Sequence, residues 1–226
     1  MTDLRYPGLE QQPGGVEKHG RLFQALRRVS RAQFGRPSGL LGNIAGFMMA
    51  RTPSNLDRAR WTLSLLDVQP NDRVLEVGFG PGLAIELVSK MATQGFVAGI
   101  DHSDEMVRQA TKRNSAGVRS GRIALRRASA SSPPAFDVEF DKIFTINSIH
   151  FWNDPVACLE NLRGLLRPGG MIAVTLQPRT RAATNATTAA LGEEIAEKLK
   201  RAGYPHCDVS MSQATSPAVA CVRATN

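Results

Sequence analysis

The sequence predicts an α/β fold in which helices cover both faces of a mostly parallel, doubly wound sheet. Two observations carry this prediction. From residue 73 onward, short apolar runs rich in strand-forming residues alternate with helical patterns, and such alternation indicates a parallel sheet with crossover connections. The first of these runs also leads directly into a glycine turn, V-L-E-V-G-F-G-P-G over residues 74–82, as expected where a strand's carboxyl end meets a ligand.

We expect seven strands, five of them parallel and two forming a C-terminal antiparallel hairpin. Apolar and β-branched runs place the parallel strands at 73–77, 96–101, 123–127, 141–146 and 171–176. The hairpin strands are expected at 207–211 and 218–223, separated by a polar segment that contains a proline.

The expected helices carry local start and stop signals. Residues 83–91 continue the glycine turn with helical spacing, and Ser103 is the expected N-cap of the helix after the second strand. Asp154-Pro155 begins a helix whose inward face reaches Leu166, and the turn Arg167-Pro-Gly-Gly170 is expected to stop it. A last helix is expected over 193–202.

Length and composition predict one globular domain preceded by a leader. The 226 residues are 42% hydrophobic, and the three cysteines show no C-x-x-C spacing, so we expect neither a disulfide framework nor a metal site. The N-terminus has no signal-like apolar segment, which predicts a cytoplasmic protein. We divide the chain into a basic helical leader or lid, 1–60, and a catalytic domain, 61–226.

The leader holds most of the excess positive charge. Residues 1–60 contain ten Arg or Lys and four Asp or Glu, which is +6 of the chain's net +8. A nucleic-acid surface, an amphipathic helix on an anionic membrane and a lid over a pocket all fit this charge. The low aromatic content disfavours nucleic acid. The apolar residues of the helical stretch 40–49, among them Phe47 and Met48, favour a lid that forms an apolar wall.

The details of the glycine turn indicate which cofactor it binds. A dinucleotide fingerprint requires a third glycine where Leu83 stands. The chain instead reads E-x-G-x-G-x-G, with Glu76 ahead of Gly78, Gly80 and Gly82. A carboxylate at this strand end suits a cationic ligand. The pattern resembles the first motif of the class I S-adenosylmethionine-dependent methyltransferases, in which the acidic residue helps to hold the ligand's ammonium end.

The resemblance covers roughly residues 63–226 and implies a Rossmann-like fold that binds S-adenosyl-L-methionine and releases S-adenosyl-L-homocysteine. Phe79 then shapes the cofactor turn together with the glycines. Asp101, at the tip of the second strand, is expected to bind the ribose hydroxyls, because Ser103 caps the next helix and leaves this carboxylate free. His102 is expected at the adenine edge.

One departure from the family concerns the adenine contact. The pair Phe140-Asp141 is similar to the usual start of the fourth strand. This alignment places Ser129 where relatives that resemble quinone-biosynthesis methyltransferases carry an aspartate. The Ser129 hydroxyl or the Ala130 backbone is expected to take over its hydrogen bond.

The segment after the fourth strand, N-S-I-H-F-W over 147–152, should line the crevice. It lacks the N-P-P-Y pattern that resembles nucleic-acid base methyltransferases. Asn147 is expected to flank both the cofactor and the reacting centre, and His150 is the candidate general base. The alternative is that His150 only packs structurally. Phe151 and Trp152 are expected to stack on a flat acceptor or to shield the sulfonium.

These features predict a small-molecule methyltransferase that acts on oxygen or nitrogen of an apolar or aromatic acceptor. Two alternatives stay open at this point. One is a nicotinamide-dependent oxidoreductase, which shares the sheet and the acidic residue after the second strand. The other is a relative that binds the cofactor without transferring a methyl group.

Overall fold

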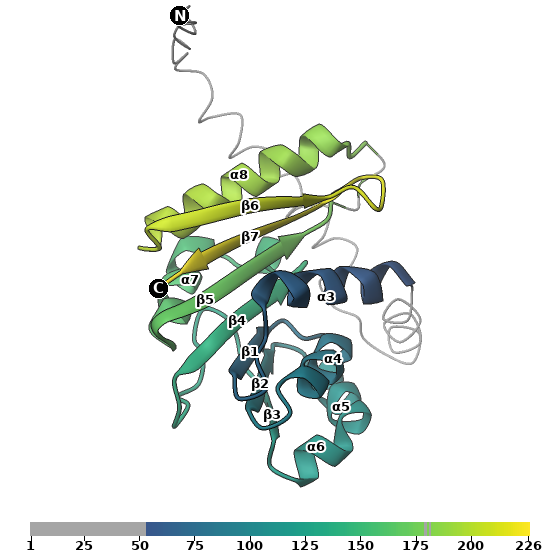
Figure 1. The fold of residues 1–226 in the computed structure, drawn as a ribbon, viewed down its shortest axis with the longest axis vertical. Coiled ribbons are helices and arrows are strands. Elements are labelled where there is room, and N and C mark those ends of the chain that lie inside the picture. The colour runs from purple at the N-terminus through teal and green to yellow at the C-terminus, as the bar shows by residue number, and fades with distance from the viewer. Residues whose placement is uncertain (1–52, 179, 181) are drawn as a thin grey trace, which may run out of the picture.

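The computed structural model describes residues 53–178, 180 and 182–226. Its centre is one seven-stranded sheet with the order β3-β2-β1-β4-β5-β7-β6 (Figure 1). Strands β1 to β5 are parallel, and β7 runs antiparallel between β5 and β6. The strands are β1 (Arg73–Val77), β2 (Phe96–Asp101), β3 (Ile123–Arg127), β4 (Phe140–Ile146), β5 (Leu166–Leu176), β6 (His206–Ser212) and β7 (Val219–Thr225). The predicted Rossmann-like, seven-stranded fold is confirmed.

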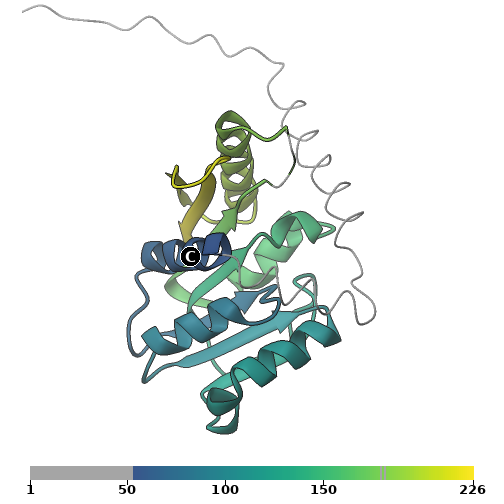
Figure 2. The same cartoon turned by 90° about the vertical axis from the view of Figure 1, so that its right-hand side faces the viewer.

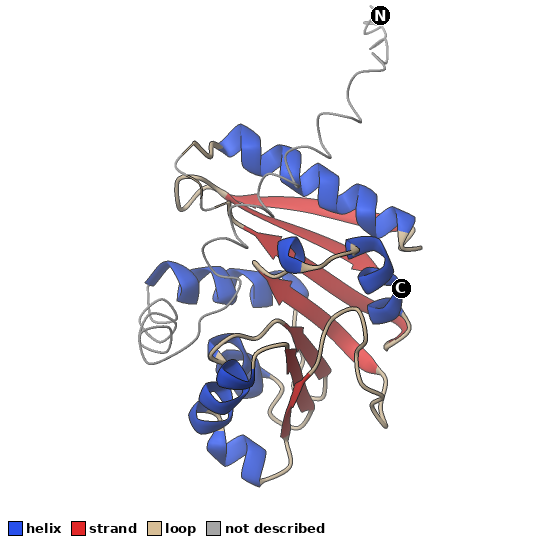
Figure 3. Cartoon of the chain, turned by 180° about the vertical axis from the view of Figure 1, so that it is seen from behind, coloured by secondary structure: helices blue, strands red, loops and turns tan. Residues whose placement is uncertain are grey.

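Helices cover both faces of the sheet. They are α3 (Pro53–Leu66), α4 (Leu83–Met91), α5 (Asp104–Arg113), α6 (Ser115–Arg119), the short 3-10 helix η1 (Ile149–Phe151), α7 (Pro155–Arg163) and α8 (Asn185–Arg201). Side chains of α3 to α6 share one core cluster and those of α7 and α8 share the other, as the opposite views of Figures 1 and 3 show. Figure 2 shows the β3 edge (teal) and the β6 edge (yellow-green) at opposite ends of the molecule.

The central strands are buried on both faces, as parallel strands between two helical layers must be. In β1, Leu75 and Val77 pack toward α7 and α8, and Val74 packs toward α3 and α4. The strand order reverses between β1 and β4, and ligands of such sheets bind at the carboxyl ends beside this reversal. The glycine turn after β1 and the loop after β4 lie there.

The start of β5 corrects one prediction. The helix before it ends at Arg163, with Gly164 as its C-cap, so Arg167-Pro-Gly-Gly170 is not its stop signal. Leu166 instead pairs with Phe140 of β4, and residues 167–170 lie within a register shift of the β4–β5 ladder. A tertiary contact explains this difference. The Phe140 N–H donates to the Leu165 carbonyl at 2.9 Å, so the segment pairs with β4 as part of the sheet.

Two further expectations need adjustment. Helix α8 begins eight residues before the expected position, since Thr184 and Thr187 form a capping box at its start. The connection from β3 to β4 contains no helix, so the predicted alternation of strands and helices is interrupted there. In its place residues 128–139 form a loop with an isolated bridge between Ser129 and Ser132.

The leader predictions lie largely outside the described residues. This holds for the helical stretch 40–49, with Phe47 and Met48. Helix α3 runs through the predicted boundary at residue 60 and packs on the sheet at β4, β5 and β7. Within the described ranges, no helix has the length and apolarity needed to cross a membrane. The same residues contain no group of three or more side chains that would bind a metal.

Candidate cofactor and acceptor site

The turn between β1 and α4 has a backbone that favours glycine. Gly78, Gly80 and Gly82 have φ values of 77°, 52° and 78°, in the left-handed region where a Cβ atom is unfavourable. The Gly78 N–H donates to the Ile100 carbonyl of β2 at 2.8 Å, and the Gly82 N–H donates to the Phe79 carbonyl at 3.0 Å. The first bond joins the turn to the second strand, and the second closes the turn itself.

The three glycines have different surroundings. A Cβ atom on Gly78 would overlap the Ser148 side chain, and one on Gly82 would lie 2.6 Å from the Ala110 Cβ. Among the described residues, nothing lies within 4 Å of a Cβ atom placed on Gly80. Gly78 and Gly82 are thus positions of close packing, whereas Gly80 is the point at which the turn faces open space.

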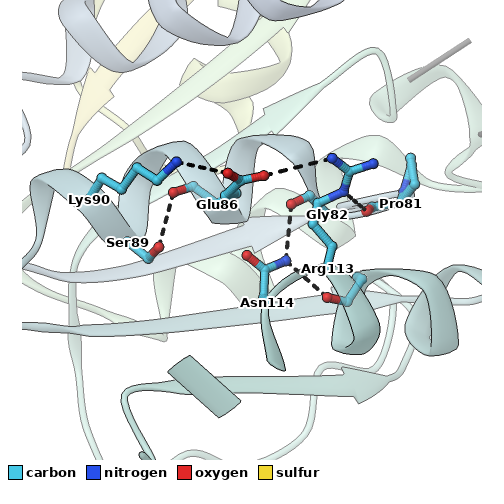
Figure 4. Close-up of polar contacts among 8 residues, drawn as sticks. Pro81, Gly82, Glu86, Ser89, Lys90, Arg113 and Asn114 are labelled. Atoms are coloured by element: carbon cyan, nitrogen blue, oxygen red, sulfur yellow. Dashed lines mark hydrogen bonds and ion pairs between the residues drawn. The ribbon is translucent and has the colours of Figure 1, made fainter. Parts of the chain in front are cut away.

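Residues at the C-terminal end of α5 hydrogen-bond to backbone carbonyls of the turn (Figure 4). The Asn114 Nδ2 donates to the Gly82 carbonyl at 3.1 Å, and the Arg113 Nε donates to the Pro81 carbonyl at 2.9 Å. The Arg113 guanidinium also lies 3.7 Å from the carboxylate of Glu86. Arg113 and Asn114 are not among the predicted site residues, because no local sequence pattern marks a contact across 32 residues.

Glu76 is a buried carboxyl group with an unsatisfied oxygen. Its side chain is 3% exposed, and its Oε2 atom has no hydrogen-bond partner among the described residues. The Glu76 pKa is raised to about 8, mainly by burial and secondly by the nearby negative charge of Asp101. A backbone hydrogen bond from Ile85 acts in the opposite direction and lowers this pKa. Without a ligand this group holds a proton at neutral pH, and a bound cation would favour its ionised form.

Asp101 joins the turn to the segment after β2. Its Oδ2 atom accepts the Gly80 N–H and its Oδ1 atom accepts the Ser103 N–H, both at 2.9 Å. The expectation that this carboxylate is free is therefore wrong, although each oxygen has a second lone pair for a ligand hydroxyl. Ser103 is the N-cap of α5, as predicted, because its hydroxyl accepts the Met106 N–H.

The predicted adenine contacts lie beside Asp101. The His102 side chain is exposed, with its Nδ1 atom 3.6 Å from the Asp101 Oδ1. The backbone after β3 joins the same place, because the Ala128 N–H donates to the Asp101 carbonyl. The Ser129 hydroxyl bonds the Ser131 hydroxyl at 2.8 Å, and Ala130 is buried.

Asn147 ends β4 in an unusual conformation. Its φ of 53° is in the left-handed region, which asparagine tolerates better than most residues. Its Oδ1 atom accepts the Gln177 N–H at 2.8 Å. Its Nδ2 atom is buried and has no hydrogen-bond partner within the described part of the chain. The amide therefore presents a donor at the end of β4, next to the strand that carries Glu76.

Helix η1 contains His150 and Phe151, and Trp152 is its C-cap. His150 is buried and its ring centroid lies 4.2 Å from that of the half-buried Phe151. Trp152 is 7% exposed, belongs to the core cluster of α7 and α8, and donates its Nε1–H to the Ser148 hydroxyl at 3.2 Å. Trp152 thus packs as a core residue, which leaves Phe151 as the better-placed ring for an acceptor.

Comparison with known proteins identifies the family. The family model described as a methyltransferase domain matches residues 74–170. An uncharacterized methyltransferase of Bacillus subtilis, YdaC, is 31% identical over 166 residues, which cover 74% of this chain and 88% of YdaC. The chain belongs to the class I S-adenosylmethionine-dependent methyltransferases. The UbiE ubiquinone/menaquinone biosynthesis C-methyltransferase of Geotalea daltonii is 30% identical over 122 residues, about half of each chain (53% and 52%).

Solved structures show the same fold. An S-adenosylmethionine-dependent methyltransferase from Aquifex aeolicus superposes with a TM-score of 0.63 at 22% identity, over 79% of this chain and 95% of that chain. The N-methyltransferase NodS from Bradyrhizobium japonicum, in complex with S-adenosyl-L-homocysteine, gives 0.61 at 18% identity, over 91% and 98%. As a member of the family identified above, this methyltransferase uses S-adenosyl-L-methionine, and the oxidoreductase and non-catalytic alternatives are set aside.

The buried carboxyl predicts opposite effects of Glu76→Gln on stability and on binding. Protonated Glu76 stabilises the cofactor-free fold, and this contribution is lost as the pH rises from 4.5, the ordinary glutamate value, to about 8. Glutamine has no charge to lose. The variant should therefore have the higher melting temperature at pH 8, with the difference disappearing near pH 4.5.

The same variant, Glu76→Gln, should bind the cofactor more weakly than the native chain. Loss of a charge-assisted hydrogen bond of about 1.5–3 kcal/mol weakens S-adenosyl-L-homocysteine binding roughly ten- to hundredfold. Thermal denaturation across pH and titration calorimetry measure the two effects. A variant that is less stable than the native chain at pH 8 and binds equally well would contradict the account.

The glycine turn offers a matched pair of variants. Gly82→Ala combines backbone strain with overlap at Ala110, so it should lower the free energy of unfolding by about 2–4 kcal/mol. Gly80→Ala should cost only the backbone strain, about 1 kcal/mol, but it places a methyl group on the open side of the turn. Denaturant unfolding should rank Gly82→Ala as the less stable, and calorimetry should show that Gly80→Ala impairs cofactor binding. Normal binding by Gly80→Ala would place the cofactor elsewhere.

Proposed function

We propose that this methyltransferase transfers a methyl group to oxygen or nitrogen of a small apolar or aromatic acceptor bound beside η1. The observation that carries the proposal is the contact between the His150 and Phe151 rings, whose centroids are 4.2 Å apart at the end of β4. A partly exposed ring beside a titratable imidazole offers an apolar surface and one polar group, which is the usual composition of a small-molecule site.

In this proposal the cofactor lies across the ends of β1, β2 and β4. Glu76 binds the ammonium group of the cofactor, and Asp101 binds a ribose hydroxyl. The backbone of residues 78–82, which includes Phe79, lies along the cofactor between them. His102, Ser129 and Ala130 surround the adenine. The geometry fits such a ligand, because Glu76 Oε2 needs a donor and the turn is open at Gly80.

The bound cofactor supplies an activated methyl group on a sulfonium, so the protein mainly aligns the acceptor and excludes water. His150 takes or orients the acceptor proton, since an imidazole titrates near neutral pH. Asn147 flanks the cofactor and the reacting centre, and Phe151 lies against the acceptor. In this proposal the leader completes the apolar wall with Phe47 and Met48.

The acceptor class is tested by a methyl-transfer screen with the full chain. Phenols, quinols, aromatic amines, fatty acids and nucleic acids are incubated with S-adenosyl-L-methionine, and the products are identified by mass spectrometry. Methylated phenols or quinols at oxygen, or an aromatic amine at nitrogen, are expected. Methylation of nucleic acid alone, or of carbon alone, would contradict the proposal.

The role of His150 gives a separate prediction. His150→Ala should lower kcat roughly 10²- to 10⁴-fold, the usual contribution of a general base, with unchanged affinity for S-adenosyl-L-homocysteine. The exposed His102 is the matched control, since His102→Ala should affect cofactor affinity and leave kcat nearly unchanged. Steady-state kinetics and calorimetry measure both variants. Unchanged turnover in His150→Ala would remove this residue from the reaction.

A further inference from the structure

Gln177, the residue after β5, connects three parts of the molecule. Its backbone N–H donates to the Asn147 Oδ1 at 2.8 Å, and its side-chain Oε1 accepts from Arg58 of α3. Its Nε2 atom donates to the Thr215 hydroxyl at 2.8 Å and to the Pro217 carbonyl at 2.7 Å, both in the connection between β6 and β7. The side chain thus fixes the end of β5 against α3 and the β6–β7 connection.

The contact with α3 is part-buried. Arg58 is 5% exposed, and its carbonyl accepts the Thr62 hydroxyl at 2.9 Å. Thr62 in turn bonds the Thr175 hydroxyl of β5 at 2.8 Å. Helix α3 is therefore attached to β5 at two successive points. Because hydrogen bonds are strong where water is excluded, this network restricts where Gln177 can lie.

The position of Gln177 determines the orientation of the Asn147 amide. The Asn147 side-chain amide has an oxygen that accepts and an NH2 group that donates. If this amide were flipped, two donors, its NH2 group and the Gln177 N–H, would face each other. The bond to Gln177 therefore keeps the NH2 group on the other side, where Nδ2 is buried without a partner in the described ranges. It also restrains a backbone in the left-handed region.

Asn147 and Glu76 have complementary requirements. Glu76 has a buried oxygen that lacks a donor, and Asn147 has a buried N–H group that lacks an acceptor within the described structure. They lie at the ends of β1 and β4, which are paired neighbours. An α-amino-acid group carries both partners that these side chains lack, an ammonium for Glu76 and a carboxylate for Asn147.

We propose that Gln177 is a positioning residue that orients the Asn147 amide toward the carboxylate of the cofactor's amino-acid end, opposite the Glu76 contact with the ammonium. This inference deepens the proposed function and rests on its placement of Glu76 and Asn147 in the cofactor site. It concerns binding of the cofactor and needs no knowledge of the acceptor.

Two ligands separate this role from a general loss of structure. S-adenosyl-L-homocysteine carries the amino-acid end, whereas 5′-methylthioadenosine has the adenosine part without it. Calorimetry measures the binding of both ligands. Asn147→Ala should weaken S-adenosyl-L-homocysteine binding about tenfold or more, and Gln177→Ala should weaken it about fivefold or more. In both variants the binding of 5′-methylthioadenosine should change less than about twofold. Gln177→Glu keeps the acceptor for Arg58 and should bind better than Gln177→Ala. Gln69→Ala, at an exposed glutamine, is the matched control and should bind as the native chain does.

The double variant Asn147→Ala/Gln177→Ala decides whether Gln177 acts through Asn147. It should bind S-adenosyl-L-homocysteine no more weakly than Asn147→Ala alone, because the second change then has nothing left to orient. Losses that multiply, or equal losses for both ligands, would overturn the positioning role. If Gln177→Ala does not fold, Thr215→Val, which removes one Nε2 contact, replaces it in the same cycle.

The outcomes separate this inference from the proposed function. If Asn147→Ala binds S-adenosyl-L-homocysteine normally, the donor role and the positioning role both fail, and the acceptor screen still judges the proposed reaction. If Asn147→Ala is impaired and Gln177→Ala is not, only the role of Gln177 fails.

Discussion

A carboxyl group buried at the end of β1 is the constraint on which the site depends. The other buried residues of its strand, Val74, Leu75 and Val77, are apolar, and one Glu76 oxygen lacks a donor among the described residues. A buried carboxylate without a counter-ion is unfavourable, so the group remains protonated until a cation reaches it. A sulfonium cofactor with an ammonium end is such a cation, which is why we propose that Glu76 binds it.

The surroundings of Glu76 form one connected frame. The Asp101 carboxylate holds the N–H groups of Gly80 and Ser103, so the cofactor turn and the end of β2 move together. The missing side chain at Gly78 lets Ser148 approach, which brings the loop after β4 against the same turn. Because these contacts join three strand ends, packing and hydrogen bonds within the protein fix the positions of the groups around the turn.

The sequence was sufficient where the signal is local. Strands β1 to β3 and helix α4 have the predicted bounds because apolar runs and the glycine turn specify them within a few residues. The sequence was insufficient where a partner lies far along the chain. Asn114 supports Gly82 across 32 residues, and Gln177 contacts Asn147 across 30, and neither residue stands out in its own segment. The engagement of Asp101 and the pairing of Leu166 with β4 were missed for the same reason. The predicted roles of the site residues stay predictions.

The central claim is that the cofactor ionises Glu76 when it binds, and proton release tests it most directly. Titration calorimetry of S-adenosyl-L-homocysteine at pH 7, repeated in buffers of different ionisation enthalpy, counts the protons exchanged on binding. A Glu76 pKa of about 8 in the free protein predicts release of close to one proton by the native chain and none by Glu76→Gln. The same proton count for both proteins would contradict the claim.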